Sequence, residues 1–138
     1  MVGPDGPVKR DSHVNLEGFR HERDAFFRWA VEQGLVKRGL LLVCGDRHWQ
    51  YHSIDPTGIE EFSTGALVTN NARLGVPPGE KESSDPEGQI RQPFISPRPV
   101  GGFLLVTVPP GTAAAPPTAR FDFYDEHGGK LYSVRRPR

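Results

Sequence analysis

Residues 39–62 read GLLLVCGDRHWQYHSIDPTGIEEF, and this stretch carries the pattern from which the fold is predicted. The apolar run 40–44 has no alternating polar face, which is typical of a strand that is covered on both sides. Two further segments have the composition of strands, and they are 49–54 and 59–62. The sequence Asp55-Pro56-Thr57-Gly58 between them is a strong turn signal, so we expect these two segments to form a β-hairpin.

Upstream of this stretch, the sequence predicts a helix from about Leu16 to Gln33, with its regular part beginning near Arg20. Asn15 is available as the N-cap and Gly34 as the C-terminal stop. The expected apolar stripe, read at helical spacing, is Phe19, Phe26, Trp29, Ala30 and Gln33. Residues 1–12 read as an unstructured lead-in.

Downstream, three more strands are expected, at 103–108, 119–124 and 130–134, with His127-Gly128-Gly129 closing the last two into a second hairpin. Residues 70–101 contain many Gly and Pro and little apolar periodicity, so this loop is either a functional surface segment or partly disordered. The predicted class is α/β, with one helix followed by a mostly antiparallel set of strands. That order resembles one half of an α/β sandwich more than a complete fold.

The composition limits the classes of protein that need to be considered. The 138 residues suit at most one ordinary domain, and the 17 basic and 17 acidic side chains cancel. Charge therefore gives no signal for a nucleic-acid or membrane partner. The single cysteine, Cys44, excludes an internal disulfide framework. The first 13 residues lack the apolar core of a signal peptide, so localisation stays open.

The polar sequence after the first strand is the main candidate site. On an extended backbone, side chains two residues apart point the same way, so Asp46 and His48 are expected to project together from the end of a buried strand. A carboxylate and an imidazole there make half of a metal site. Arg47 would face the other way unless the chain turns at Gly45. The competing interpretation is that Asp46 starts a turn and His48 is a half-exposed strand residue.

A second cluster, Asp11-Ser12-His13-Val14-Asn15, precedes the predicted helix. His13 and Asn15 are candidate metal ligands if this segment reaches the end of the following strand, although helix capping also explains Asn15. His52 is four residues after His48, so on an extended strand the two side chains would lie on the same face. His52 is either a partner of the site or a buried strand residue.

The sequence LLLVCGDRHWQYHSIDPTGIEEFSTGA (40–66) resembles the C-terminal signature of the PhoD-like alkaline phosphatases, which belong to the calcineurin-like metallophosphatases. The lead-in GPD…KRDSHVN…GFRHE and the closing GGFLLVTV…ARFDFYDEHGGKLY are also similar to the last third of that family. The resemblance covers most of the chain except the 70–101 loop.

The resemblance implies the C-terminal half of a four-layered α/β/β/α fold that hydrolyses phosphomonoesters or phosphodiesters with divalent or trivalent metal ions (Fe, Ca, Mn or Zn). Asp46 and His48 stand where the superfamily has a metal-binding Gly-His-x-His motif, with aspartate in place of the first histidine. A further ligand would map near His13 or Asn15. Arg47 or His52 would stabilise phosphate charge or protonate the leaving group. Members of this family are often exported.

The superfamily also uses Asp-x-His, Gly-Asp-x-x-Asp and Gly-Asn-His-Asp/Glu motifs, which are not present here as a set. The resemblance therefore implies a C-terminal fragment whose partner is the missing N-terminal half of the domain. Two alternatives stay open from the residues themselves. One is a non-catalytic, β-rich interaction module, and the other is a degenerate remnant that folds poorly because its strand edges are unpaired.

Overall fold

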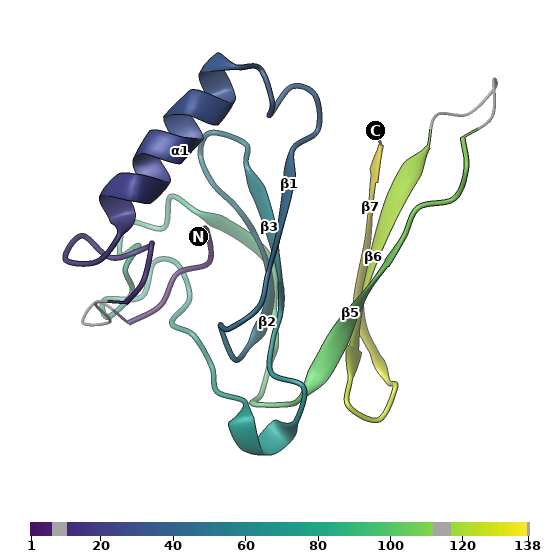
Figure 1. The fold of residues 1–138 in the computed structure, drawn as a ribbon. Helices are drawn as coiled ribbons and strands as arrows, with labels where there is room; N and C mark the ends of the chain where they lie inside the picture. Colours follow the sequence, from purple (N-terminus) through teal and green to yellow (C-terminus); the bar gives the residue numbers. More distant parts are fainter. Residues whose placement is uncertain (7–10, 112–116, 138) are drawn as a thin grey trace.

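The computed structural model describes residues 1–6, 11–111 and 117–137, and these form three layers (Figure 1). A helix lies on one face of a four-stranded sheet, and a three-stranded sheet lies on the other face. The mixed α/β class, with one α-helix and two mostly antiparallel sheets, is confirmed for the described residues. At 13 residues, the α-helix is too short to cross a lipid bilayer, and the described residues contain no other candidate span.

Helix α1 spans Arg20–Glu32 and ends before Gly34, whose positive φ of 68° is the left-handed conformation that stops many helices. The N-cap residue is Phe19, and no side chain caps it, so the assignment of Asn15 as N-cap is wrong. The buried face consists of Arg23, Phe27 and Ala30, which follow the i, i+4, i+7 spacing. The predicted stripe is therefore displaced around the helix, and Trp29 is exposed.

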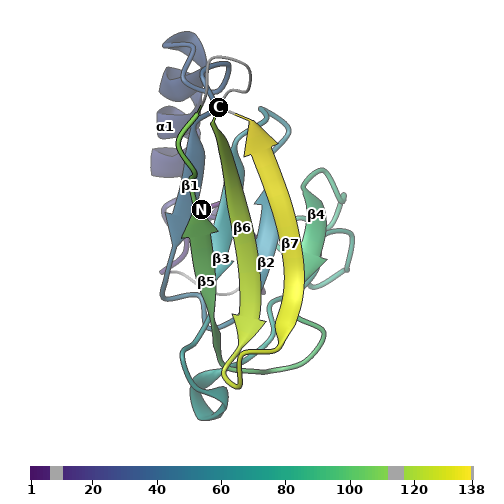
Figure 2. The same cartoon turned by 90° about the vertical axis from the view of Figure 1, so that its right-hand side faces the viewer.

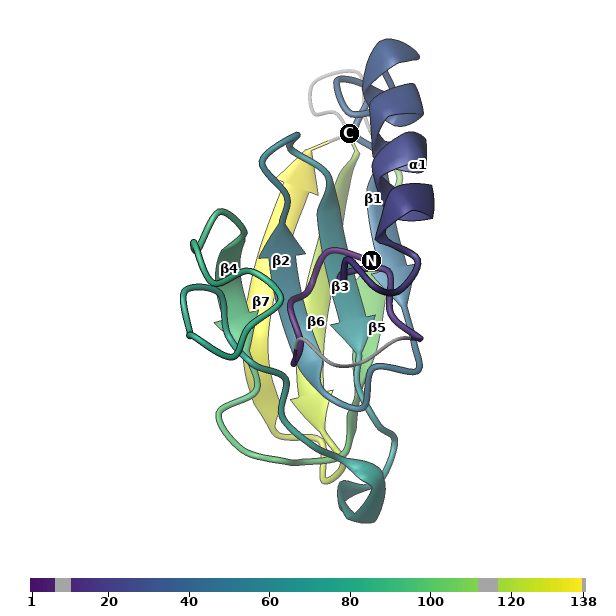
Figure 3. The same ribbon diagram turned by 90° about the vertical axis from the view of Figure 1, so that its left-hand side faces the viewer.

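The first sheet has the strand order β1-β3-β2-β4, and its strands are β1 (Leu41–Cys44), β2 (Gln50–Ile54), β3 (Glu60–Thr64) and β4 (Arg91–Ile95). The predicted hairpin is confirmed, because β2 and β3 pair in antiparallel fashion around the Asp55 turn. Strand β1 pairs in parallel with β3, so both strands end at the same edge. Figure 3 shows α1 over the β1 side of this sheet and the N-terminal segment crossing the same face.

The second sheet has the order β5-β6-β7, with β5 at Gly102–Thr107, β6 at Thr118–Asp125 and β7 at Lys130–Pro137. It packs against the first sheet, and in Figure 2 strand β5 lies in front of β1, which is an edge strand of the first sheet. The core between the sheets is aromatic: the rings of Phe62 and Phe121 stack at 3.9 Å, and those of Phe94 and Tyr132 at 4.8 Å. Burial of these rings is the main apolar contribution that joins the two sheets.

Two predicted loops are more ordered than expected. A 3-10 turn, η1 (Thr69–Asn71), overlaps the start of the 70–101 region, and the edge strand β4 lies within this region. The carboxylate of Asp85 holds the approach to β4 by accepting hydrogen bonds from the amides of Gln89 and Ile90. The prediction of an unstructured lead-in is wrong for residues 1–6, because Val2 is fully buried. Residues 7–10 lie outside the described part of the chain.

Candidate functional site

The sequence Gly45–Trp49 forms a bent loop between β1 and β2, and we call it the GDRH loop. Strand β3 lies between β1 and β2 in the sheet, so the loop crosses the end of β3 to reach the start of β2. The hydroxyl of Ser63 on β3 donates a hydrogen bond to the carbonyl oxygen of Trp49 at 2.9 Å and fixes the end of the loop. The loop therefore lies at the carboxyl ends of two parallel strands, where α/β proteins commonly bind ligands.

The backbone of the GDRH loop is not extended. Asp46 and His48 have φ values of 63° and 64°, and they are the two non-glycine residues with positive φ among those that the structure describes. The expectation that an extended strand directs both side chains to one side is therefore wrong in its premise. Asp46 is exposed and His48 is half-buried. Left-handed residues of this kind are costly and gather at functional sites.

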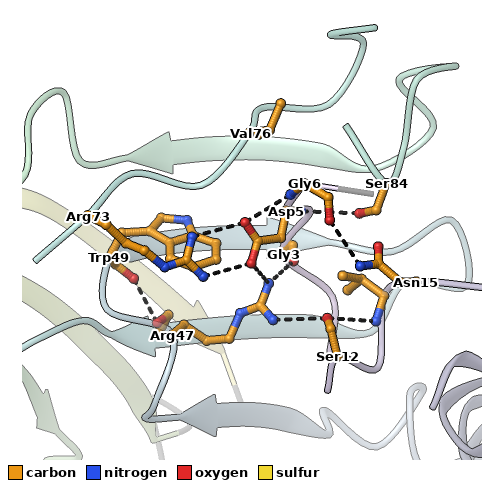
Figure 4. Close-up of polar contacts among 12 residues, drawn as sticks. Gly3, Asp5, Gly6, Ser12, Asn15, Arg47, Trp49, Arg73, Val76 and Ser84 are labelled. Atoms are coloured by element: carbon orange, nitrogen blue, oxygen red, sulfur yellow. Dashed lines mark hydrogen bonds and ion pairs between the residues drawn. The ribbon is translucent and has the colours of Figure 1, made fainter. Parts of the chain in front are cut away.

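Arg47, between these two residues, contacts the N-terminal segment (Figure 4). Its Nη2 donates to the carbonyl oxygen of Gly3 at 2.8 Å, and its Nη1 donates to the hydroxyl of Ser12 at 3.2 Å. Only 11% of the side chain is exposed. Because two of its donors already bond to Gly3 and Ser12, Arg47 mainly stabilises the contact between the loop and the N-terminal segment.

Asp5 is the buried anion of the site. Its two carboxylate oxygens accept hydrogen bonds from Nη1 and Nη2 of Arg73, at 3.0 and 2.7 Å, which is a bidentate pair (Figure 4). Nη2 of Arg47 lies 3.8 Å from the same carboxylate. The backbone of Asp5 exchanges hydrogen bonds with Ser84, whose amide donates to the Asp5 carbonyl at 2.7 Å. Asp5 thus joins the N-terminal segment to the 70–101 region.

The indole ring of Trp49 supports both guanidinium groups. The Cζ atoms of Arg73 and Arg47 lie 4.3 and 4.6 Å from the ring centroid. Stacking of this kind fixes the plane of a guanidinium group and adds a favourable cation–π interaction. A Cβ atom at Gly75 would lie 2.3 Å from the indole, so the chain packs directly on the ring at that point.

The charges of this cluster do not cancel, because two guanidinium groups face one carboxylate. Burial alone would raise the pKa of Asp5, but the hydrogen bonds from Arg73 and the Gly6 amide, with the charges of Arg73 and Arg47, outweigh it and keep that pKa below its usual value. Asp5 is therefore ionised at neutral pH, and the three side chains together carry one positive charge.

The structure does not bring the second predicted cluster to the GDRH loop as ligands. The imidazole Nε2 of His13 lies 3.7 Å from the carboxylate of Glu22 on α1, and its ring packs near Phe19. The amide Nδ2 of Asn15 donates to the Gly6 carbonyl at 2.9 Å, and Asn15 is buried. Within the described parts of the chain, no three His, Cys, Asp or Glu side chains are grouped so that they could hold a metal ion.

His52 lies between the two sheets, where a substrate cannot reach it. Its side chain has no exposed surface, and its ring stacks on Phe62 at 4.4 Å. Nε2 is 2.9 Å from the carboxylate of Glu60, and Nδ1 is 3.2 Å from the hydroxyl of Tyr132. The catalytic assignment of His52 is therefore corrected: the strand that carries it is covered on both faces, and the residue is a polar part of the core.

Two members of the site, Asp5 and Arg73, were not identified from the sequence. Asp5 is part of the GPD lead-in, which contributed only to the resemblance, and Arg73 lies in the segment without periodicity. Neither residue type is distinctive by itself, and the two meet only through the tertiary structure. The chain matches no family model, and no curated protein or solved structure shows significant similarity to it.

Proposed function

We propose that the chain supplies the GDRH loop to a metal-dependent phosphoric ester hydrolase site, as the C-terminal part of a PhoD-like metallophosphatase domain. The observation that carries the proposal is the placement of an exposed carboxylate and a half-buried imidazole, Asp46 and His48, in a left-handed loop at the ends of β1 and β3. The resemblance of GDRHWQYHS to the family signature supports the same assignment.

The donors fit a metal ion only as part of a set. Carboxylate and imidazole suit divalent or trivalent ions such as Mn, Zn or Fe, and a carboxylate also suits Ca. Catalytic zinc sites have three protein ligands, and no three His, Cys, Asp or Glu side chains are grouped in that way among the described residues. We therefore propose that further ligands come from a partner segment, the N-terminal half of the domain.

The open edges of the two sheets support such a partner. β1 and β5 are edge strands on the same side of the molecule (Figure 2). Val43 on β1 and Val106 on β5 are 54% and 42% exposed. An added strand beside β1 would cover apolar surface and end next to the GDRH loop, which follows β1 directly.

When bound, the metal would polarise a phosphoryl oxygen and lower the pKa of a coordinated water. The residues of this chain have separate tasks. Asp46 and His48 would hold the ion, Arg47 would fix the loop through Gly3 and Ser12, and Asp5 would orient the guanidinium groups beside it. The positive charge of this cluster would favour a phosphate ester over a neutral ester.

The test is a titration with Mn²⁺ that is monitored by NMR, because NMR detects the weak metal affinity expected of a site with two ligands. Mn²⁺ should broaden the side-chain resonances of Asp46 and His48 first, since paramagnetic broadening falls off with distance from the ion. His48→Ala and Asp46→Asn should each remove the effect. His127→Ala is the matched control, because His127 is an exposed histidine in the β6–β7 turn.

Equal broadening at His127 and His48, or none at either, would contradict the proposal. Hydrolysis of bis(p-nitrophenyl) phosphate is then measured with each metal. Turnover that is lost in His48→Ala would show that the chain is catalytic by itself. Site-specific metal binding without turnover is the result expected if the ligand set is completed by the partner segment.

A further inference from the structure

Arg73 is the solvent-accessible cation of the candidate site. Its side chain is 37% exposed, against 11% for Arg47, and its guanidinium group stacks on the buried ring of Trp49. Its amide donates a hydrogen bond to the carbonyl oxygen of His48 at 3.0 Å, so the backbone of Arg73 lies directly against the GDRH loop. The charge is therefore accessible, and the backbone of the residue that carries it lies against the GDRH loop.

The guanidinium group of Arg73 has one edge formed by Nη1 and Nη2 and another formed by Nε and Nη2, and the pair with Asp5 uses the first of these edges. Asp5 occupies the edge formed by Nη1 and Nη2, and Nη1 also donates to the carbonyl oxygen of Leu74 at 3.2 Å. Within the described part of the chain, no hydrogen bond is made by Nε of Arg73, and Nη2 bonds only to Asp5. Since a guanidinium group has five N–H donors in a planar fork, the Nε–Nη2 edge keeps two parallel donors.

We propose that this Nε–Nη2 edge binds a tetrahedral oxyanion of the phosphate class. Two parallel N–H donors match two oxygens of a phosphoryl group, as in other bidentate arginine–phosphate pairs. The excess positive charge of the Asp5–Arg47–Arg73 cluster favours an anion, and the stack on Trp49 together with the pair to Asp5 holds the donors in place before binding.

This inference adds a substrate-binding residue to the hydrolase site proposed above, and it rests on that proposal for the identity of the ester. The anion itself has two sources, a phosphate ester or free orthophosphate. Arg73 would position the phosphoryl group beside the loop that carries Asp46 and His48. The metal is not needed for this contact, so it can be tested separately.

The experiment measures oxyanion binding without added metal, by ³¹P NMR and by thermal shift, with orthophosphate, phenyl phosphate and sulfate at matched ionic strength. The wild type should bind both phosphate compounds saturably at concentrations up to about 10 mM, the range expected of a few charge-assisted hydrogen bonds. Arg73→Gln should weaken binding about tenfold or more. Stronger binding of phenyl phosphate than of orthophosphate would identify the ester as the preferred source.

Arg73→Lys separates binding from folding, because it keeps a charge beside Asp5 and loses the forked edge. It should unfold at a higher temperature than Arg73→Gln, because the ammonium group still faces Asp5, and it should bind phosphate about tenfold more weakly than the wild type. Arg98→Gln is the matched control, since Arg98 is an exposed arginine of the same segment.

The inference is overturned if the wild type shows no saturable binding, or if Arg73→Lys and Arg73→Gln bind phosphate like the wild type. Equal losses in Arg98→Gln would also overturn it, because they would mean that only general surface charge attracts the anion. The Mn²⁺ broadening at His48 does not depend on these results. Failure of this inference and failure of the proposed function are therefore distinguishable.

Discussion

The amide of Arg73 donates a hydrogen bond of 3.0 Å to the carbonyl oxygen of His48. This single bond joins the GDRH loop to a segment that has no regular secondary structure at that point. Two residues further on, Gly75 packs on the indole of Trp49. The segment that carries Arg73 and Gly75 therefore contacts both His48 and Trp49. The loop conformation thus depends on residues that are remote in the sequence.

Gly75→Ala should destabilise the protein by about 1–3 kcal/mol, because the new methyl group would overlap the Trp49 ring. The position has no positive φ, so the cost is one of space and not of backbone conformation. Urea unfolding followed by tryptophan fluorescence measures it. Gly6→Ala is the matched control near the same site, since a Cβ there meets no atom within 4 Å. Similar losses in both variants would contradict the packing argument.

His52→Ala should lower the free energy of unfolding by about 2–4 kcal/mol, since it opens a cavity and removes partners from Glu60 and Tyr132. His127→Ala should change it by no more than about 0.5 kcal/mol, because that residue is exposed. Both are measured by chemical unfolding. A His52→Ala variant as stable as the wild type would contradict the structural role that is argued from burial.

Glu60 should make the stability of the protein sensitive to acid. Burial raises the pKa of Glu60, but hydrogen bonds from His52 and Arg136 more than offset this, and the pKa lies below its usual value of 4.5. The ionised group therefore contributes stability that is complete well above pH 4.5 and is lost as the pH falls through the lowered pKa.

Glu60→Gln should accordingly be less stable at neutral pH, and its stability should fall less steeply in acid. Urea unfolding over roughly pH 3 to 7 measures the two slopes. Glu82→Gln is the control, since Glu82 is exposed. If the Glu60→Gln and wild-type curves stay parallel through the acid range, the carboxylate does not couple folding to protonation.

Strands with a strong local signal were predictable from the sequence. The hairpin of β2 and β3 was found from its apolar segments and the Asp55 turn, and the hairpin of β6 and β7 from the turn at His127. β4 was missed because it contains Pro93 and pairs with β2 across an irregular register. As an edge strand it has a free side, where a residue without an N–H is tolerated.

The candidate site was predictable only where its chemistry is contiguous in the sequence. Asp46, Arg47 and His48 are distinctive residue types after an apolar run, so the pattern indicates a site. Their conformation was not predictable, since the left-handed backbone depends on contacts with Ser63 and Arg73 from elsewhere in the chain. The pair of Asp5 and Arg73 was not predictable for the same reason, since the two residues are 68 positions apart and meet only in the folded chain.

Because Asp46 has a left-handed backbone conformation, substitutions at this position can separate the conformational strain of the loop from metal binding by the carboxylate. Asp46→Gly should be neutral or stabilise the protein by up to about 1 kcal/mol, because glycine adopts φ near 63° without strain. Asp46→Val should destabilise it by about 1–2 kcal/mol, because a β-branched residue is poorly tolerated there. Chemical unfolding measures both changes.

Both substitutions remove the carboxylate, so both should abolish the Mn²⁺ broadening at His48, whatever their effect on stability. A variant that is at least as stable as the wild type and no longer binds metal would show that Asp46 is kept for binding at a cost in folding energy. If Asp46→Gly instead loses more than about 1 kcal/mol, the carboxylate supports the loop structurally, and its exposure would no longer argue for a ligand.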